Sequence, residues 1–265
     1  MLSFYIISFV QVVLESLPVS SSGHIHLLEQ LLGQKYSKEL MYLLHIPTLF
    51  ILGFFFAKPL ILYIREYAQN KAAIVKLVFF TVLIDTITAL FFIFFARYNP
   101  TSYYSLDRLL MIGFIVTALL LYSLRWCTKN NDTSLTIHKA IILGTAQGCA
   151  LLPGISRFAT VYATSCWLGL SPLYAFSITW FVQAPLIAAA VAKAICFSSL
   201  SAELSLLCTV PAGIMLCLAT VVGYCALLAS YVLVSRDRLW LFAYYMIIPI
   251  LLAFFCINYY TQTLF

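Results

Sequence analysis

The residues with the clearest chemical potential form one short segment, Glu15-Ser-Leu-Pro-Val-Ser-Ser-Ser-Gly-His24. It places a carboxylate, several hydroxyls and an imidazole within ten residues of a chain that is 63% hydrophobic and 9% charged. Ionisable groups at membrane depth cost free energy, so they usually face a cavity or a partner and mark function. This segment is therefore the first candidate for a functional site.

Around this segment the chain is predicted to pass from one helix into another. Gln11 and Glu15 are four residues apart and share a helical face. Pro18 ends that helix, because the residue before a proline avoids the helical region. The next helix then begins with free backbone N–H groups, which bind anions. Three hydroxyls suit the cap of that helix: Ser20, Ser21 and Ser22.

The first turn of this second helix extends the predicted site. Gly23 has no side chain and allows close approach to the backbone. His24 lies three residues after Ser21 and is predicted to face the same way. Its imidazole titrates in the range that general acid–base chemistry uses.

A second segment, Leu152-Pro-Gly-Ile-Ser-Arg157, repeats the pattern of a break followed by a hydroxyl at a helix start. Arg157 lies deep in an apolar region, where a guanidinium needs an anionic partner, and its forked donors match phosphate oxygens. If the two segments meet, they form a phosphate site able to support phosphoryl transfer by positioning and charge stabilisation. The residues alone leave open whether such a site catalyses a reaction or only binds phosphate.

The elements that must position these residues are membrane helices. Apolar stretches of about 20 residues cross a bilayer core, and the chain has six, at roughly 40–57, 74–96, 107–126, 174–197, 206–234 and 239–260. Residues 1–33 and 138–170 differ from these. Each has a short apolar run, a Pro/Gly/Ser break and a second short run, which favours a re-entrant helix hairpin.

The basic residues predict how these elements alternate across the membrane. Connections at 58–76, 125–139 and 235–238 carry nine Lys and Arg residues, whereas those at 35–38, 97–108 and 193–203 carry five. Positive-inside bias places the first set in the cytoplasm.

Alternation across the membrane then requires each hairpin to return to its own side. We therefore predict one all-α polytopic membrane domain over residues 1–265. It consists of two inverted repeats, approximately 1–127 and 138–265, each made of a hairpin plus three transmembrane helices, with the hairpin tips meeting near the midplane.

Local patterns echo this duplication. Gln11 and Gln147 each precede the proline of their hairpin, and the following spans contain the similar motifs His45-Ile-Pro47 and Gln183-Ala-Pro185. His45 by itself is interpreted as structural. Asp85, in the middle of a span, needs a partner, and both a functional role and a polar bond between helices remain open.

Bulk composition excludes several other classes of function. The eight cysteines lack a Cys-x-x-Cys pair and lie mostly in apolar segments, which predicts buried thiols rather than metal ligands or disulfides. The net charge of +6 comes mostly from segment ends, where lipid headgroups and topology explain it, so no nucleic acid is expected. The N-terminus lacks a basic region, so no cleavable signal peptide is expected.

Two motifs resemble a known family, the bacterial undecaprenyl-diphosphate phosphatases of the integral-membrane, bacitracin-resistance type. The segment from Gln11 to His24 is similar to the family's (Glu/Gln)-x3-Glu element followed by Pro-Val-Ser-Ser-x-Gly-His. Pro153-Gly-Ile-Ser-Arg157 is similar to the start of its second motif, Pro-Gly-x-Ser-Arg-Ser-x-x-Thr. Length and hydropathic profile are similar over the whole chain.

The resemblance implies hydrolysis of the 55-carbon undecaprenyl diphosphate to undecaprenyl phosphate and inorganic phosphate, which recycles the lipid carrier for peptidoglycan synthesis in the cell wall. It implies a multi-pass protein of the bacterial inner membrane whose active site opens to the outer, periplasmic side. The expected cofactor is a divalent cation, Mg2+ or Ca2+. The expected partners are the polyprenyl diphosphate and membrane lipids, with a homodimer as the candidate assembly.

The same resemblance assigns roles to residues. Ser21 matches the nucleophile or its polariser, and His24 matches the nearby acid/base or nucleophile; which of them attacks stays open. Glu15 matches the acid linked to metal or base function, Gln11 is an orienting amide, and Arg157 binds phosphate. Five further residues are expected to contact the substrate phosphates: Ser20, Ser22, Gly23, Gly154 and Ser156.

The chain also departs from the family pattern. Phe158 replaces the serine after the arginine, Val161 stands at the threonine position, with Thr160 one residue early, and Ser177 occupies the place of an acid in the following span. These changes remove polar contacts from the second tip. A rival interpretation is an inverted-repeat transporter or a polyprenyl-phosphate flippase, since paired broken helices are also a transporter architecture. A purely structural membrane scaffold does not explain Arg157.

Overall fold

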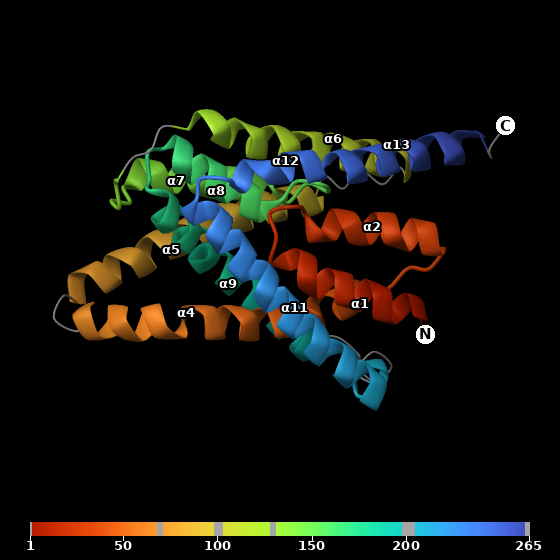
Figure 1. Cartoon of the computed structure of the whole chain (residues 1–265), viewed down its shortest axis with the longest axis horizontal. Helices are drawn as coiled ribbons and strands as arrows, with labels where there is room; N and C mark the ends of the chain where they lie inside the picture. The colour runs from red at the N-terminus through yellow and green to blue at the C-terminus, as the bar shows by residue number, and fades with distance from the viewer. Residues whose placement is uncertain (1, 68–70, 98–102, 128–130, 198–204, 263–265) are drawn as a thin grey trace.

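A computed structural model of the chain describes residues 2–67, 71–97, 103–127, 131–197 and 205–262 (Figure 1). Within these ranges the structure is helical, apart from one isolated backbone bridge between Asp132 and Leu170. The predicted all-α polytopic fold is confirmed. Six helical stretches are long and apolar enough to cross a membrane: Lys38–Ala57, Val75–Arg97, Asp107–Trp126, Pro172–Cys196, Val210–Ser235 and Leu239–Asn258.

The two predicted hairpins are present as pairs of short helices. The first pair is α1 (Leu2–Glu15) and α2 (Ser21–Leu32); the second is α7 (Ile137–Cys149) and α8 (Arg157–Trp167). At 1.5 Å per residue these helices are roughly 16–21 Å long, which is well short of a hydrocarbon core of about 30 Å. Their re-entrant course in a membrane stays a prediction.

The longer helices complete each half. The first half contains α3 (Lys38–Leu43), α4 (Ile46–Tyr67), α5 (Lys71–Arg97), α6 (Tyr103–Ser123) and η1 (Leu124–Trp126). The second half contains α9 (Pro172–Phe197), α11 (Val210–Ser235), η2 (Leu239–Leu241), α12 (Phe242–Tyr245) and α13 (Ile247–Gln262).

Two of the predicted continuous spans are interrupted. The span at 40–57 is divided into α3 and α4 next to Pro47, and the span at 239–260 is divided into η2, α12 and α13 next to Pro249. Proline has no N–H to donate to the carbonyl four residues earlier, so Pro47 and Pro249 remove the bonds that would continue each helix. His45 lies in the first interruption and Tyr245 borders the second, and their side chains approach Glu15 and His24 of the first hairpin.

Helix packing follows the same scheme in the two halves. The first hairpin helix α1 packs on α11, and its counterpart α7 packs on α5; α2 contacts α13, and α8 contacts α6. Figure 1 shows α1 and α2 on the right of the molecule and α7 and α8 toward the left. This pairing is what two inverted repeats would produce, and it supports that prediction.

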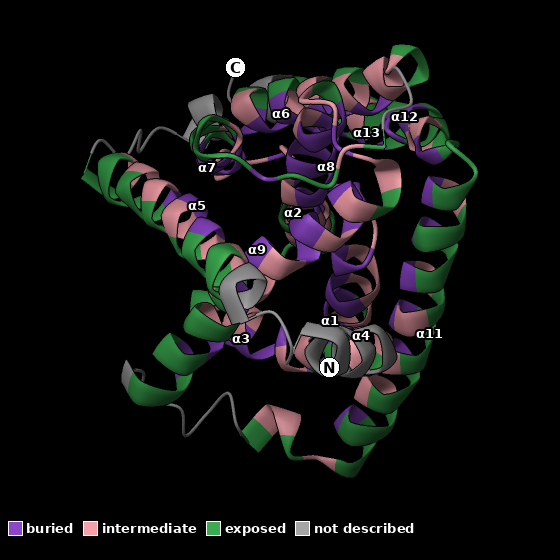
Figure 2. Ribbon diagram, turned by 90° about the vertical axis from the view of Figure 1, so that its left-hand side faces the viewer, coloured by how far each residue is buried: buried purple, intermediate pink, exposed green. Residues whose placement is uncertain are grey.

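The most deeply buried part of the chain surrounds the hairpins. Eight of the eleven residues of α8 are buried, so this helix is enclosed by protein rather than lipid. Figure 2 shows buried residues gathered on the central helices, while exposed residues cover the outer sides of α5 and α11. Many of those exposed side chains are large and apolar, among them Phe79, Phe94, Val221 and Leu218, as expected for a surface that faces lipid.

Candidate active site

The two hairpin tips meet in the structure. Arg157, the first residue of α8, places Nη2 3.5 Å from Oε1 of Glu15, the last residue of α1. Glu15, Ser21 and Arg157 line one small cavity, together with Ser20, Ser22, Ser156, Gln183 and a wall of apolar side chains. The guanidinium therefore faces the carboxylate and the serine hydroxyl from the opposite hairpin, although the two segments are about 140 residues apart in the chain.

Glu15 is the centre of this arrangement. Its Oε2 accepts hydrogen bonds from the hydroxyl of Ser21 and from Nε2 of Gln11, the latter at 3.3 Å. Its Oε1 accepts from Nε2 of Gln183 on α9 at 3.1 Å, beside the bond from Arg157. The ring nitrogen Nδ1 of His45 lies 3.9 Å from Oε2. Side chains from both halves of the chain thus converge on one carboxylate.

The charges in the cavity suit an anionic ligand. The Glu15 side chain is only 3% exposed, whereas that of Arg157 is 26% exposed and reaches the cavity. The guanidinium of Arg157 donates to Glu15, and among the described residues it has no other hydrogen-bond partner. Its remaining N–H groups can therefore bind phosphate oxygens.

The backbone of the first tip has an unusual conformation. Ser20 precedes α2 with φ 64°, in the left-handed region, and its side chain makes no hydrogen bond to the start of the helix. The prediction that the Ser20 hydroxyl caps α2 is therefore wrong, because a capping residue normally has an extended backbone that turns its oxygen toward the helix. Its buried Oγ has no partner among the described residues and lies at the cavity wall.

The second tip is held by a threonine on α6. Oγ1 of Thr117 donates to the carbonyl of Gly154 at 3.0 Å and accepts from the N–H of Ser156 at 2.9 Å. Ser156 in turn caps α8, as predicted, by accepting from the N–H of Ala159 at 3.2 Å. Arg157 is therefore the first residue of a helix whose start is fixed by hydrogen bonds to the neighbouring transmembrane helix α6.

The two glycines allow both tips to pack closely against α6. A Cβ on Gly23 would lie 2.8 Å from the ring of Phe114 and 3.1 Å from the Cα of Gly154, and one on Gly154 would lie 2.2 Å from the carbonyl oxygen of Leu110. Gly154 also has φ 82°, which an L side chain rarely adopts. Neither glycine is among the cavity-lining residues. The close approach at Gly23 is thus to α6 and to the other tip, and the phosphate contacts expected of both glycines stay a prediction.

His24 makes contacts of its own. Its Nδ1 lies 2.8 Å from the carbonyl oxygen of Ser20, so this nitrogen must carry a proton. Its Nε2 lies 3.1 Å from the hydroxyl of Tyr245 on α12, and the two rings are stacked. His24 is not among the residues that line the cavity, and the bond of Ser21 goes to Glu15 instead. Ser21 and His24 are predicted to face the same way, but they make no hydrogen bond to each other.

Four site residues were absent from the sequence-based set: His45, Thr117, Gln183 and Tyr245. The repeated polar-x-Pro motif contained a usable signal for two of them, because His45 and Gln183 are its polar members and both approach Glu15. Thr117 and Tyr245 have no comparable signal. Each lies in an apolar span, and only the packing of α6 and α12 against the hairpins brings it to the site.

Asp85 lies outside this cluster. Its Oδ1 accepts a hydrogen bond from Nε2 of Gln147 at 3.3 Å, which joins α5 to α7. This contact matches the interpretation of Asp85 as a polar bond between helices. It also gives a shared role to Gln11 and Gln147, which precede the prolines of the two hairpins. Each of these glutamines donates a hydrogen bond to a carboxylate, Gln11 to Glu15 and Gln147 to Asp85.

The donor set around Glu15 is compatible with a hard divalent cation. Within the described ranges no group of three or more His, Cys, Asp or Glu side chains is placed to hold a metal. Mg2+ sites commonly use one or two carboxylates plus substrate phosphates, however. Glu15 supplies the carboxylate, and two buried oxygens near it have no hydrogen-bond partner among the described residues, Oε1 of Gln183 and Oγ of Ser20.

Comparisons with known proteins show which proteins this chain is similar to. The undecaprenyl-diphosphatase of Korarchaeum cryptofilum (strain OPF8) is 28% identical over 254 residues, which cover 92% of this chain and 94% of that protein. The undecaprenyl-diphosphatase of Caldicellulosiruptor bescii is 28% identical and covers 92% of this chain and 93% of its own length. Undecaprenyl-diphosphatase 2 of Bacillus thuringiensis (strain Al Hakam) is 31% identical, over 69% of this chain and 71% of its own length.

A family model described as bacitracin resistance protein BacA matches residues 4–252, a range that contains both hairpins and every side chain of the Glu15 cluster. The chain therefore belongs to the BacA family.

Proposed function

We propose that this protein hydrolyses undecaprenyl diphosphate to undecaprenyl phosphate and inorganic phosphate, and so recycles the lipid carrier for peptidoglycan synthesis. The relatives named undecaprenyl-diphosphatase support this activity. The observation that carries it is the contact of Arg157 with Glu15 and, through Glu15, with Ser21 at the junction of the two hairpins. A cation for the phosphates, a hydroxyl and a carboxylate able to accept its proton are the parts that phosphoryl transfer needs.

Binding of the diphosphate depends on Arg157 and on two helix starts. The guanidinium binds phosphate oxygens through its forked donors. The starts of α2 and α8 add backbone N–H groups and the positive ends of their helix dipoles. Ser20, Ser22 and Ser156 line the same cavity and provide further polar contacts. Because Glu15, Ser20 and Ser156 of this cavity are buried, the charges there act more strongly than they would in solution.

For the chemical step, the geometry favours Ser21 as the nucleophile and Glu15 as its base, since the Ser21 hydroxyl donates to Glu15. Glu15 takes the hydroxyl proton while Oγ attacks the terminal phosphorus. The bond from that phosphorus to the bridging oxygen breaks, and undecaprenyl phosphate leaves. Water then attacks the phosphoserine, and the Ser21 oxygen departs with the proton held by Glu15. His24 lies one turn further along α2 and is the base in the alternative route, in which water attacks directly.

A divalent cation, when bound, would supply positive charge to neutralise the diphosphate. Glu15 is the residue that would hold it, with the side-chain oxygens of Gln183 and Ser20 nearby. The protein groups retain their own tasks in this scheme. Arg157 orients the phosphate, Ser21 attacks, and Gln11 and Gln183 fix the orientation of the Glu15 carboxylate.

Release of inorganic phosphate from undecaprenyl diphosphate by the purified protein in detergent tests this proposal. We expect Ser21→Ala, Glu15→Gln and Arg157→Ala each to lower kcat/KM at least about 100-fold, the scale of losing a nucleophile, a base or an oxyanion donor. Matched controls are Ser235→Ala and Arg125→Lys, both exposed residues away from the cavity, and these should keep the parental rate.

The same measurement of phosphate release distinguishes a phosphatase from a transporter or flippase. Phosphate release in detergent needs no membrane, whereas a transporter or flippase would move lipid or anion across liposomes without hydrolysis. Trapping of a labelled phosphoryl group on Ser21 after acid quenching would support the covalent route. Turnover by Ser21→Ala within a few-fold of the parent would assign attack to water instead and overturn the role of Ser21.

A further inference from the structure

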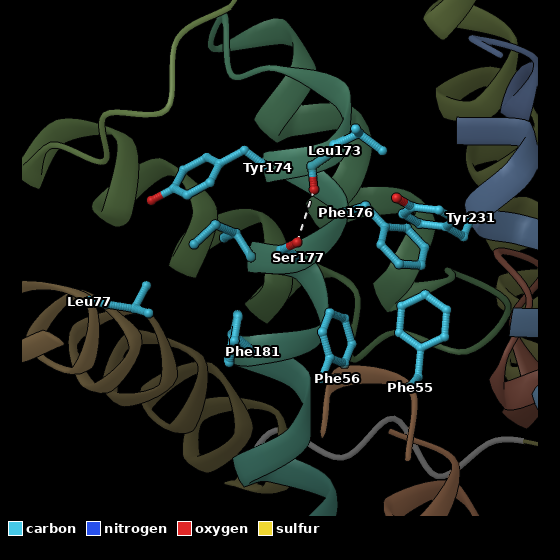
Figure 3. Close-up of a pocket in the computed structure, with 10 residues that line it drawn as sticks. Phe55, Phe56, Leu77, Leu173, Tyr174, Phe176, Ser177, Phe181 and Tyr231 are labelled. Atoms are coloured by element: carbon cyan, nitrogen blue, oxygen red, sulfur yellow. Dashed lines mark hydrogen bonds between the residues drawn. The ribbon is translucent and has the colours of Figure 1, made fainter. Parts of the chain in front are cut away.

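A second cavity lies beside the polar one and is lined almost wholly by aromatic and aliphatic side chains (Figure 3). Its volume is about 370 Å3, within the range of pockets that enclose small organic ligands. Helices α4, α5, α9 and α11 form its walls. The lining residues are Phe55, Phe56, Leu77, Leu173, Tyr174, Phe176, Ser177, Ile178, Phe181 and Tyr231.

The lining suits an apolar chain without polar groups. The hydroxyl of Ser177 already donates to the carbonyl of Leu173 at 3.0 Å, as the dashed line in Figure 3 shows. It therefore needs no hydrogen-bond acceptor from a ligand. Rings of Phe55, Phe56 and Phe176 are 4.9–6.5 Å apart and inclined to one another. Such inclined rings present faces and edges to methyl groups and double bonds along a kinked hydrocarbon chain.

Two buried rings lie between the aromatic cavity and the polar one. Phe158 follows Arg157 in the chain and lines the polar cavity. Its ring lies 5.8 Å from the ring of Phe176, which lines the aromatic cavity, and 5.1 Å from that of Trp180. A chain attached to a phosphate at Arg157 therefore needs to extend past the rings of Phe158 and Phe176 to enter the second cavity.

Two departures from the family motif lie at these cavities. Phe158 puts a ring in the wall of the polar cavity where a serine is expected, and Ser177 puts a small neutral group in the lining of the aromatic cavity where an acid is expected. A carboxylate at position 177 would place a charge among the aromatic side chains, at a cost in desolvation. In this protein both positions instead leave the surroundings of the aromatic cavity uncharged.

From this arrangement we infer that the aromatic cavity binds a stretch of the polyprenyl tail of the same substrate molecule whose diphosphate occupies the polar cavity. The inference rests on the proposed function, because it needs a headgroup at Arg157. The volume holds only a few isoprene units, so the remainder of the tail lies in the bilayer. The cavity therefore selects for a tail that is long enough to reach it.

Filling the cavity tests the inference. Ser177→Phe adds a ring inside the lining, whereas Thr86→Phe adds the same bulk on an exposed side of α5. We expect Ser177→Phe to raise KM for undecaprenyl diphosphate about tenfold, the scale of a lost apolar subsite, and to leave hydrolysis of the five-carbon dimethylallyl diphosphate within twofold of the parent. Thr86→Phe should change neither value.

The short substrate also reports on folding, since a misfolded variant would lose both activities together. Equal loss with both substrates, or no change with either, would overturn the inference. Loss of a copurified phospholipid from Ser177→Phe without a change in KM would assign the cavity to bulk lipid and would also overturn it.

A labelling experiment keeps this result separate from the proposed function. A prenyl diphosphate analogue with a benzophenone in its tail should label the 173–181 segment of the parent on irradiation. Inorganic diphosphate should reduce this labelling to the same extent in Thr86→Phe and in the parent. Labelling of 173–181 without phosphate release would retain the tail site and reject the hydrolase. Phosphate release with labelling only elsewhere would do the reverse.

Discussion

Glu15 shows how much a single residue depends on its neighbours. Its carboxylate is buried, yet it accepts hydrogen bonds from Gln11, Ser21, Gln183 and Arg157. A buried carboxylate costs several kcal/mol unless it is paired and hydrogen-bonded in this way. Removing one partner therefore alters the orientation of the group that is proposed to activate Ser21.

At the same scale, we predict that Tyr245 positions His24. Tyr245→Phe keeps the stacked ring but removes the hydroxyl 3.1 Å from Nε2. Because the other ring nitrogen is bonded to the Ser20 carbonyl, the variant leaves Nε2 without a hydrogen-bond partner among the described residues. We expect kcat to fall about tenfold with KM within twofold, together with a changed pH–rate profile, as for an acid–base group that has lost its orientation.

The adjacent Tyr244→Phe is the matched control, since Tyr244 is exposed and contacts Tyr122 and Trp240 instead. Phosphate release at several pH values measures both variants. Identical profiles for Tyr245→Phe and the parent would show that the hydroxyl has no part in the reaction.

At the scale of elements, the interrupted helices place polar groups at the hairpins. The break between α3 and α4 presents His45 to Glu15, and the break between α12 and α13 presents Tyr245 to His24. Each break lies beside a proline, which cannot donate the backbone bond of a continuous helix. Irregular backbone at membrane depth is tolerated where protein surrounds it, and Leu44 and His45 at the first break are both buried.

The second tip should depend on one hydroxyl of α6. Thr117→Val has nearly the same shape but leaves the Gly154 carbonyl and the Ser156 N–H without their buried partner. We expect a loss of about 1–3 kcal/mol of stability and a lower Tm in detergent, along with reduced phosphate release, because Arg157 follows this turn. Thr86→Val removes an exposed hydroxyl that bonds only within its own helix and should leave the Tm unchanged. Equal Tm values for the two variants would contradict the role of Thr117.

At the scale of the whole molecule, the paired packing of the two halves has a consequence for orientation. The two hairpins pack in corresponding ways, α1 on α11 and α7 on α5, and inverted repeats would make them enter from opposite sides. Positive-inside bias places the basic connections in the cytoplasm, so we predict that the turn after α2 faces the outside of the cell and that the turn after α11 faces the inside.

Single cysteines in a variant whose eight native cysteines are replaced test this orientation. We expect Gln34→Cys to react with a membrane-impermeant maleimide in intact spheroplasts, and Arg236→Cys to react only after permeabilisation. Both residues are exposed in the structure, so accessibility from the membrane side decides the result. The opposite pattern would invert the proposed topology, and labelling of both in intact cells would reject the assignment of two sides.

The sequence by itself determined which segments are helical and which residues carry charge at membrane depth. Hydropathy and residue spacing are local properties, so they predict six spans, two broken segments and the reactive character of Glu15, Ser21 and Arg157. They also predict that Ser156 caps a helix start, which depends only on neighbouring residues.

Only the tertiary structure decided which of these residues meet. Contacts such as Arg157 to Glu15, Gln183 to Glu15 and Tyr245 to His24 join residues between about 140 and 220 positions apart, and they depend on how each helix is rotated and how deeply each tip is inserted. Rotation and depth follow from packing across the whole bundle, which no local pattern encodes.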